Sequence, residues 1–280
     1  MDYLAARQAH VEDGLAAVVA DVDPDELRGQ VSHAALSGGK RVRPTVTILA
    51  CEALGGDAAD AVDFAVGIEL VHTASLVIDD IIDESAVRRG VASTWAAYGH
   101  GGAVIASDGL IGEAFRLFSV SPRAMERVAD AMVDLGEGEA TELVAEPADE
   151  AAYMELARQK TGALFRAAAE LGAIAAGADD ETVDGLGRYA ERVGIAFQIR
   201  DDVLDAVAEP AELGKPTGQD ATMERPSLVR VADLTPEEAE HRARHQADLA
   251  LEALDSVAIR DPTAGDYLAD LAEFVVTREN

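Results

Sequence analysis

The sequence predicts one all-α domain that spans residues 1–280 and contains about ten helices. Apolar residues recur at helical spacing along nearly the whole chain, as in Val62, Val66 and Leu70, which fall on one helix face. Aromatic residues make up only 4% of the chain, and no alternating run with a hairpin turn marks a β-strand. Hydrophobic residues make up 49%, which is ample for a sizeable core and argues against wholesale disorder.

Helix starts and ends are legible in chain order. Several prolines stand where a helix would begin, because proline fits the first helical turn, whose N–H groups lack partners within the helix. Residues that can cap a helix stand directly before four of these prolines, and glycines mark breaks between helices. The expected caps are Asp23, Ser121, Thr235 and Asp261, and the expected breaks are residues 55–56, Gly90, residues 99–102 and Gly177.

The charge of the chain restricts its partners. Asp and Glu number 53 against 23 Lys and Arg, a formal net charge of −30, so a nucleic acid or an anionic membrane would be repelled. The acidic residues are spread along the chain, which indicates a charged surface suited to a high-salt cytoplasm. Cys51 is the only cysteine, so no intrachain disulfide can form. We expect no transmembrane segment, because no apolar run reaches roughly 18 residues, and we expect a cytoplasmic protein.

Two clusters of aspartate each follow an apolar helical segment. The first is DDIID at residues 79–83, in which Asp79 and Asp83 lie one helical turn apart with Asp80 beside them. Carboxylate oxygens on one helix face are ligands that Mg²⁺ prefers, especially where substrate phosphates complete its octahedron. The second cluster, DDVLD, repeats the pattern with Asp201, Asp202 and Asp205.

Aspartate is abundant in this chain, so one such cluster would be weak evidence for a metal site. A solvated acidic helix face is the ordinary alternative. Two clusters at the same helical phase, each beside a hydrophobic run, favour cation binding, because carboxylates crowded against a core would otherwise repel one another. Two such faces turned toward each other would hold a diphosphate through several Mg²⁺ ions.

Only three lysines occur, and each stands where a phosphate could approach. Lys40 follows two glycines, Lys160 precedes Thr161, and Lys215 follows a glycine. If acidic residues have replaced surface lysine, the remaining three should be those whose chemistry requires a cation. The alternative, three leftover surface lysines, is disfavoured by these neighbours.

With the basic motifs added, the sequence resembles the polyprenyl synthetase family, which includes farnesyl and geranylgeranyl diphosphate synthases. The resemblance runs from about residue 38 to residue 226, in the order typical of the family. It rests on GGKRVRP at residues 38–44, the two aspartate clusters, RRG at residues 88–90, the Lys-Thr pair at residues 160–161 and GK at residues 214–215. The resemblance implies a helical bundle around a central cavity.

The resemblance also implies a role for each site residue. An allylic diphosphate would be bound through three Mg²⁺ ions, for which Mn²⁺ can substitute. The implied metal ligands are Asp79, Asp83, Asp201 and Asp205, with Asp80 and Asp202 in support. The residues implied to neutralise the remaining charge of the allylic diphosphate are Arg88, Lys160 and Lys215. The residues implied to bind isopentenyl diphosphate are Lys40, Arg43, His72 and Arg89, with Arg225 at a position where the family often has lysine. Thr161 and Gln198 would place oxygen dipoles near a carbocation.

Product length is expected to depend on the helix before the first aspartate cluster. Residues one turn before Asp79 share its face, so Ser75 and its neighbour Ala74 should line a tunnel for the growing chain. In the family, bulky aromatic residues at these positions stop growth at farnesyl diphosphate. The small residues here imply a deeper floor, near Val71 or on a neighbouring helix, and a product such as geranylgeranyl diphosphate (C20).

Three alternatives remain open from the sequence. A class I terpene cyclase shares the first aspartate motif, but it would leave Lys40, Arg43 and Arg89 without a second diphosphate to bind. A non-catalytic regulatory subunit should have lost metal ligands, and a cation-binding scaffold would carry out no reaction.

Glu139 stands where the family often has glutamine. By family analogy we expect a homodimer.

Overall fold

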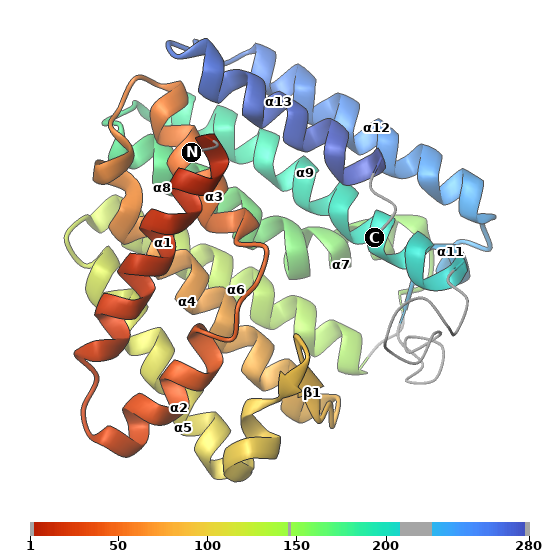
Figure 1. Cartoon of the computed structure of the whole chain (residues 1–280). Helices are drawn as coiled ribbons and strands as arrows, with labels where there is room; N and C mark the ends of the chain where they lie inside the picture. The colour runs from red at the N-terminus through yellow and green to blue at the C-terminus, as the bar shows by residue number, and fades with distance from the viewer. Residues whose placement is uncertain (1–2, 145–146, 208–225, 278–280) are drawn as a thin grey trace.

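The computed structural model describes residues 3–144, 147–207 and 226–277, and nearly all of them are helical (Figure 1). This architecture confirms the all-α class. The helices are α1 (Tyr3–Ala20), α2 (Asp25–Ala35), α3 (Val42–Ala53), α4 (Ala58–Ile82), α5 (Thr94–Phe118), α6 (Pro122–Val144), α7 (Glu150–Ala157), α8 (Ala163–Ala175), α9 (Asp180–Val207), α11 (Leu228–Val231), α12 (Pro236–Asp255) and α13 (Pro262–Thr277).

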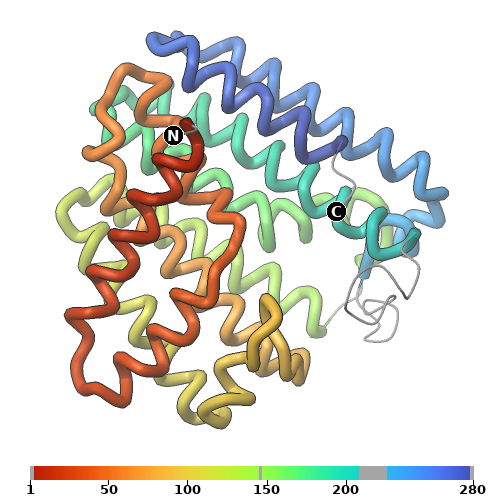
Figure 2. Tube along the Cα trace, viewed as in Figure 1, coloured from red at the N-terminus to blue at the C-terminus, as the bar shows by residue number. Residues whose placement is uncertain are grey.

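The core lies between two long helices, α4 and α9, and the helices that surround them. α4 packs against α3, α5 and α8, whereas α9 packs against α8 and α12. The antiparallel pair α12 and α13 runs along the outer side of α9, and α1 lies across α3 and α4 (Figures 1 and 2). Because α4 is apolar around most of its circumference, it is buried on several sides, as expected for a central helix.

The apolar character of α4 differs from the expectation that no segment could span a membrane. Among the described helices, α4 alone is long and apolar enough to do so by length and composition. Within the most apolar window of α4, 67% is buried inside the fold. This burial is typical of the core helix of a globular protein, since a membrane span presents its apolar side chains to lipid.

Three of the four expected caps are confirmed. Thr235 and Glu238 form a reciprocal capping box at the start of α12. Ser121 Oγ accepts from the Ala124 N–H, and Asp261 Oδ1 accepts from the Thr263 N–H. The fourth expectation is wrong: α2 begins after Pro24, and the carboxylate of Asp23 accepts from the Arg28 side chain instead.

Two features that sequence periodicity did not predict lie beside the aspartate and basic motifs. Strands β1 (Val87–Arg88) and β2 (Val91–Ala92) form a two-residue antiparallel hairpin. Its two turn residues, Arg89 and Gly90, have φ values of 53° and 80°, the signature of a tight hairpin turn whose twist matches the strands. The strands are too short for an alternating pattern, and tertiary contacts such as that between His33 Nε2 of α2 and the Ala92 carbonyl, at 2.7 Å, hold the hairpin in place.

The second feature is a π-helical segment, η1 (Arg158–Gly162), between α7 and α8. A π-helix inserts one extra residue into a helical turn and is often found at functional sites. Gly162 lies against α9, where a Cβ added at Gly194 would come within 2.9 Å of the Gly162 Cα. The glycines therefore let η1 approach α9 closely. η1, which carries Lys160 and Thr161, packs against both α9 and α6.

Candidate active site

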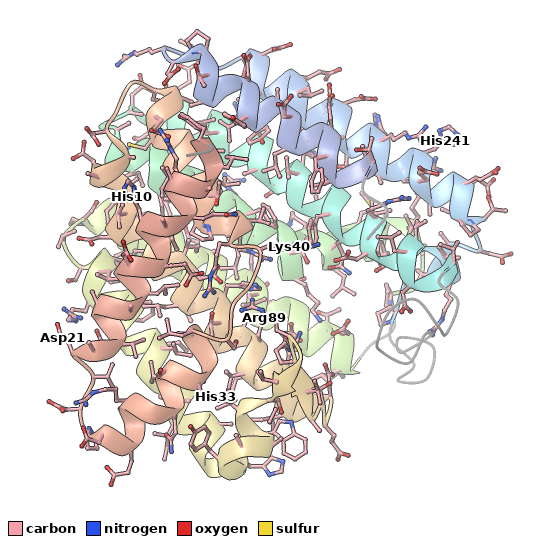
Figure 3. All side chains as sticks on the ribbon, in the orientation of Figure 1. His10, Asp21, His33, Lys40, Arg89 and His241 are labelled. Carbon is pink, nitrogen blue, oxygen red and sulfur yellow. The ribbon has the colours of Figure 1, made fainter. Side chains whose placement is uncertain are left out.

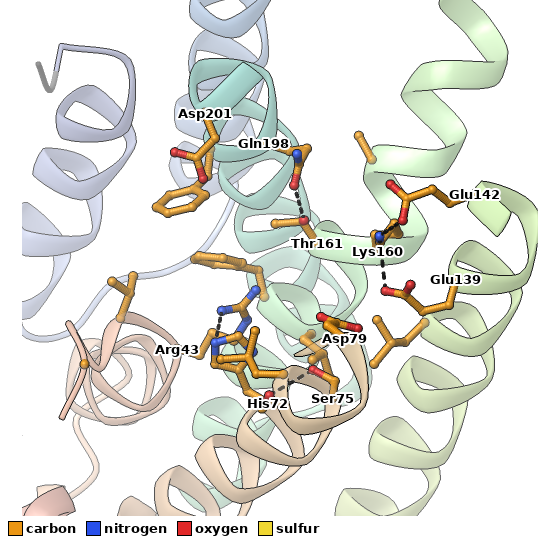
Figure 4. A pocket seen from close by; sticks show the side chains of 18 of the residues that line it. Arg43, His72, Ser75, Asp79, Glu139, Glu142, Lys160, Thr161, Gln198 and Asp201 are labelled. Atoms are coloured by element: carbon orange, nitrogen blue, oxygen red, sulfur yellow. Dashed lines mark hydrogen bonds and ion pairs between the residues drawn. The ribbon is translucent and has the colours of Figure 1, made fainter. Parts of the chain in front are cut away.

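A cavity of about 650 Å³ opens between α3, α4, α6, η1, α8 and α9. Its walls carry side chains from both aspartate clusters. Asp79 and Asp83 come from the end of α4, and Asp201 and Asp202 come from α9. Asp79 and Asp201 face the cavity from opposite walls (Figure 4). Side chains from both clusters thus share one cavity, the arrangement in which they could hold a diphosphate through bound cations.

Asp79 occupies a strongly acidic part of this wall. Burial, together with the nearby carboxylates of Glu139 and Asp83, raises its pKa from 3.8 to about 7, although Lys160 and Arg88 oppose the change. Both effects disfavour the charged carboxylate. A bound cation would reverse them, so the donor set fits a hard metal ion such as Mg²⁺.

Asp80 points elsewhere. Its side chain is 2% exposed and accepts two hydrogen bonds from Arg88, at 2.6 Å from Nη2 and 2.9 Å from Nε. Within the described residues that line the cavity, Arg88 is present and Asp80 is not. Neighbouring residues on a helix point about 100° apart, so Asp80 orients Arg88 while Asp79 faces the cavity.

The second cluster differs from the first, because both Asp201 and Asp202 line the cavity. Asp202 is buried at 3% exposure and accepts hydrogen bonds from Tyr153, from the Leu228 N–H at 2.8 Å and from Gln198 Nε2 at 3.1 Å. Asp201, one position earlier, lines the cavity. Asp205 lies half-buried one turn beyond Asp201 and, in the described chain, does not contribute to the lining.

Lys160 meets two carboxylates that the sequence had not marked as site residues. Its Nζ lies 3.2 Å from Glu139 Oε1 and also pairs with Glu142, and both glutamates come from α6 (Figure 4). Burial lowers the pKa of Lys160, but Glu142 and Glu139 outweigh it and raise the pKa above its ordinary value. Glu139 was noted only as an unusual residue. The three-residue spacing of these glutamates on one helix was the available signal for Glu142.

Thr161, which follows Lys160 on η1, forms a polar pair with Gln198 of α9 (Figure 4). The Thr161 hydroxyl donates to Gln198 Oε1 at 2.7 Å, and the Gln198 amide donates to Asp202. The pair places hydroxyl and amide oxygens in a wall that is otherwise apolar, since Leu164, Phe165 and Phe197 also line the cavity. Such oxygens suit a passing positive charge.

The residues predicted to bind isopentenyl diphosphate, namely Lys40, Arg43, His72 and Arg89, also line the cavity. The Arg43 guanidinium stacks over the Phe165 ring at 4.6 Å, and its Nη1 lies 3.2 Å from His72 Nε2. Burial lowers the pKa of Arg43 to about 10, with Arg89 adding to the effect while Glu69 and Asp201 oppose it. Burial and these arginines hold the pKa of His72 well below its usual range, so His72 is neutral and can accept from Arg43.

The Arg43 guanidinium can still donate a hydrogen bond to a ligand. Its buried Nε has no hydrogen-bond partner among the described residues, which is unusual for a guanidinium and suits an anionic ligand. Lys40 and Arg89 also line the cavity, and Arg89 donates to the Gly38 carbonyl. The four residues expected to bind isopentenyl diphosphate are thus adjacent in space. Lys215 and Arg225 lie outside the described residues.

The three residues expected to set product length, Val71, Ala74 and Ser75, lie partly at the cavity and partly in the core. In the described part of the chain, Ser75 lines the cavity, but Ala74 and Val71 do not. Ala74 is 1% exposed, and its carbonyl accepts from Ser107 on α5 at 3.3 Å. Of these three described residues, Ser75 is therefore the one that faces the cavity.

Across the described residues, no three carboxylate, imidazole or thiol groups approach closely enough to hold an ion by themselves. The aspartates stand on two walls, so they fit a site in which a substrate diphosphate supplies further oxygens.

Comparisons with known proteins give the family. A family profile described as "Polyprenyl synthetase" matches residues 24–257. The chain belongs to this family. It is 35% identical to the geranylfarnesyl diphosphate synthase of Aeropyrum pernix, over 92% of this chain and 86% of that protein. It is also 35% identical to the octaprenyl diphosphate synthase of Escherichia coli, over 86% of this chain and 80% of that protein.

Solved structures agree with this assignment. The geranylgeranyl pyrophosphate synthetase of Pyrococcus horikoshii superposes with a TM-score of 0.90 at 32% identity and covers 99% of this chain and 97% of its own. Both the expected fold and the expected class of prenyl diphosphate synthase are therefore confirmed. The relatives are named for different products, so likeness alone does not fix the product of this chain.

Proposed function

We propose that the chain is a Mg²⁺-dependent trans-prenyl diphosphate synthase that condenses isopentenyl diphosphate with an allylic diphosphate and most readily yields geranylgeranyl diphosphate. The observation that carries this proposal is that one cavity has an acidic wall and a basic pocket, which would bind two diphosphates in different ways. The acidic wall is formed by aspartates on facing helices with Lys160 and Arg88 beside them, and the basic pocket lies around Arg43. Two diphosphates can bind there side by side.

The roles of the residues follow from their positions. Asp79, Asp83 and Asp201 would hold the metal ions, with Asp205 one turn further along α9. Mg²⁺ bound there would supply the positive charge that stabilises the departing diphosphate. Arg88 and Lys160 would bind the remaining oxygens of the allylic diphosphate.

Arg43 and Lys40, with His72 and Arg89, would bind the second diphosphate and place the isopentenyl double bond against the allylic carbon. The Thr161–Gln198 oxygens would stabilise the positive charge that forms as the allylic C–O bond breaks. The apolar wall around Phe165 and Phe197 would exclude water from this carbocation. The double bond attacks it, and the released diphosphate takes the proton lost in the final step.

Product length is proposed from the residues before Asp79. Ser75 is small and faces the cavity, and the lining near it is aliphatic, with Leu76 and Leu135. Nothing bulky and aromatic stands at this position, which favours a chain longer than farnesyl. Relatives named for geranylgeranyl and geranylfarnesyl products support this range.

We further propose a single-domain, cytoplasmic homodimer adapted to high salt. Exposed apolar side chains on α5 and α6, namely Val104, Ile105 and Val133, support a partner surface on these helices. The net charge of −30 supports the salt adaptation.

The test is product analysis. Purified protein is incubated with radiolabelled isopentenyl diphosphate and with dimethylallyl, geranyl or farnesyl diphosphate in turn, with and without Mg²⁺. Dephosphorylated products are then separated by chromatography. A labelled geranylgeraniol peak that requires Mg²⁺ supports the proposal. Release of an unlabelled hydrocarbon from the allylic substrate alone would indicate a cyclase, and absence of turnover would indicate a regulatory subunit or a scaffold.

A further inference from the structure

Arg41 belongs to the basic motif at residues 38–44, but its side chain is already fully occupied by protein. It is 3% exposed, and each of its three guanidinium nitrogens is engaged. Nη1 donates to Glu69 at 2.6 Å, Nε donates to Glu12 at 2.7 Å, and Nη2 donates to the Ala35 carbonyl at 2.8 Å and to Glu12 at 3.3 Å. Arg43, two positions later, keeps an unpartnered Nε among the described residues. The two arginines of this motif therefore have different roles: Arg41 binds protein groups, whereas Arg43 has a donor left for a ligand.

Glu12 and Glu69 come from different helices, neither of which carries the motif. Glu12 lies on α1, and Glu69 lies on α4 one turn before His72. A second contact from α1 reaches the same loop, because Gln8 Nε2 donates to the Lys40 carbonyl at 3.3 Å. α1 thus contacts residues 40–41 at two points: Gln8 binds the Lys40 carbonyl, and Glu12 binds the Arg41 side chain.

The hairpin holds the other end of the loop. Arg89 donates to the Gly38 carbonyl, and a Cβ added at Gly39 would meet its guanidinium at 2.8 Å. Lys40 and Arg89 are both labelled in Figure 3, beside the chain that leads from α2 to α3. The loop that carries Lys40 is therefore fixed between Arg89 on one side and the partners of Arg41 on the other.

The backbone at Arg41 requires such fixing. Its φ of 48° lies in the left-handed region, which is costly for a residue with a side chain. A strained conformation of this kind persists only where the surroundings determine it. The carboxylates of Glu12 and Glu69 are the groups that do so here, and helix α3 with Arg43 begins directly after this residue.

We propose that Arg41 is a positioning residue, and that Glu12 of α1 and Glu69 of α4 hold it so that Lys40 and Arg43 stand at the spacing a diphosphate requires. α1 thereby takes part in binding isopentenyl diphosphate although it lies outside the cavity wall. The inference rests on the proposed function, because it assumes that the basic pocket binds a diphosphate.

The chain offers a matched control for the docking of α1. Arg7 pairs with Glu52 of α3 at 2.5 Å, and the Tyr3 hydroxyl donates to the same carboxylate at 2.9 Å. This contact also joins α1 to α3 through a carboxylate, here a buried one, but it lies away from the loop and the cavity. Removal of Glu52 loosens α1 without touching Arg41.

The experiment compares Glu12→Ala with Glu52→Ala in steady-state kinetics, with each substrate varied in turn. For Glu12→Ala we expect the KM for isopentenyl diphosphate to rise about tenfold, because Arg41 loses the carboxylate that accepts from its Nε and Nη2. The KM for the allylic diphosphate and kcat should change less than about twofold, because a lost ground-state contact raises KM alone. Glu12→Gln should restore part of the affinity, and Glu52→Ala should leave both KM values near those of the wild type.

Equal KM changes in Glu12→Ala and Glu52→Ala, or no change in either, would overturn the inference, because α1 would then act only as a docked helix. Glu69→Ala could fail to fold, since it strands a buried charge, so Glu12 carries the test. An inactive wild type would instead contradict the proposed function.

Hydrogen exchange gives a readout that needs no turnover. Amides of residues 38–43 should exchange faster in Glu12→Ala than in Glu52→Ala, and equal exchange would contradict the role of Glu12 even in an inactive protein.

Discussion

Asp79→Asn should make the metal-free protein more stable while it destroys activity. The folded protein holds this carboxyl at a pKa of about 7, against an ordinary value of 3.8, because the side chain is buried and lies near Glu139 and Asp83. Since the folded state binds the proton more tightly than the unfolded state, the stability contributed by this group falls as pH rises from about 4 to about 7. Above that range, the charged carboxylate destabilises the fold.

The size of the effect follows from the pKa difference. At 1.36 kcal/mol per pKa unit, the span from 3.8 to about 7 corresponds to at most about 4 kcal/mol. Water in the open cavity screens the carboxylate, so we expect about 2 kcal/mol. Asparagine keeps the shape and removes the charge. In a chelator at about pH 8, Asp79→Asn should therefore unfold with a free energy about 2 kcal/mol higher than the wild type.

The assay is denaturant unfolding followed by circular dichroism, at about pH 8 and about pH 4. At the lower pH the two proteins should be nearly equal, because Asp79 is then protonated. Asp63→Asn is the control, since it removes the same charge from an exposed site on the same helix, and it should change stability by less than about 0.5 kcal/mol. An Asp79→Asn variant no more stable than the wild type at about pH 8 would refute the reasoning.

Three further predictions follow from the site and the charge. Arg43→Ala should mainly raise the KM for isopentenyl diphosphate, whereas Lys160→Ala should mainly impair use of the allylic diphosphate; kinetics with each substrate varied would contradict the divided site if both variants behaved alike. The thermal midpoint should rise as KCl increases from dilute toward molar concentration, because ions screen a net charge of −30; a flat or falling midpoint would remove the salt-adaptation proposal. Ser75→Phe should shorten the product more than Ala74→Phe, because only Ser75 of the two lines the cavity in the described chain; chromatography showing unchanged products for both would mean that this helix face does not set chain length.

Periodicity and spacing were enough to predict much of this molecule. Helical spacing predicted an apolar helical segment before each aspartate cluster, which the structure has as α4 and α9, and i,i+4 spacing predicted carboxylates grouped on one face of each helix. Apolar period and i,i+4 geometry are local properties, so they can be read without knowing the fold. The inward direction of Asp79 and the separate direction of Asp80 follow from the same helical geometry.

The parts that could not be predicted depend on tertiary contacts. η1 differs from an α-helix by one inserted residue, which no apolar pattern marks. The Arg88–Gly90 turn is too short to show an alternating strand pattern. Glu142 reaches Lys160 only because α6 packs beside η1, and the contacts of Arg41 with Glu12 and Glu69 depend on the packing of α1 and α4 against the loop before α3.

The most direct test of the central claim is turnover of labelled isopentenyl diphosphate by Asp79→Ala and Asp201→Ala. The claim is that carboxylates from two facing helices bind metal ions which activate the allylic diphosphate. Each variant should lose at least about 10²–10³-fold in kcat, as expected when groups that stabilise developing charge are removed. Asp63→Ala should retain wild-type turnover. Near-normal turnover by either cavity variant would contradict the account.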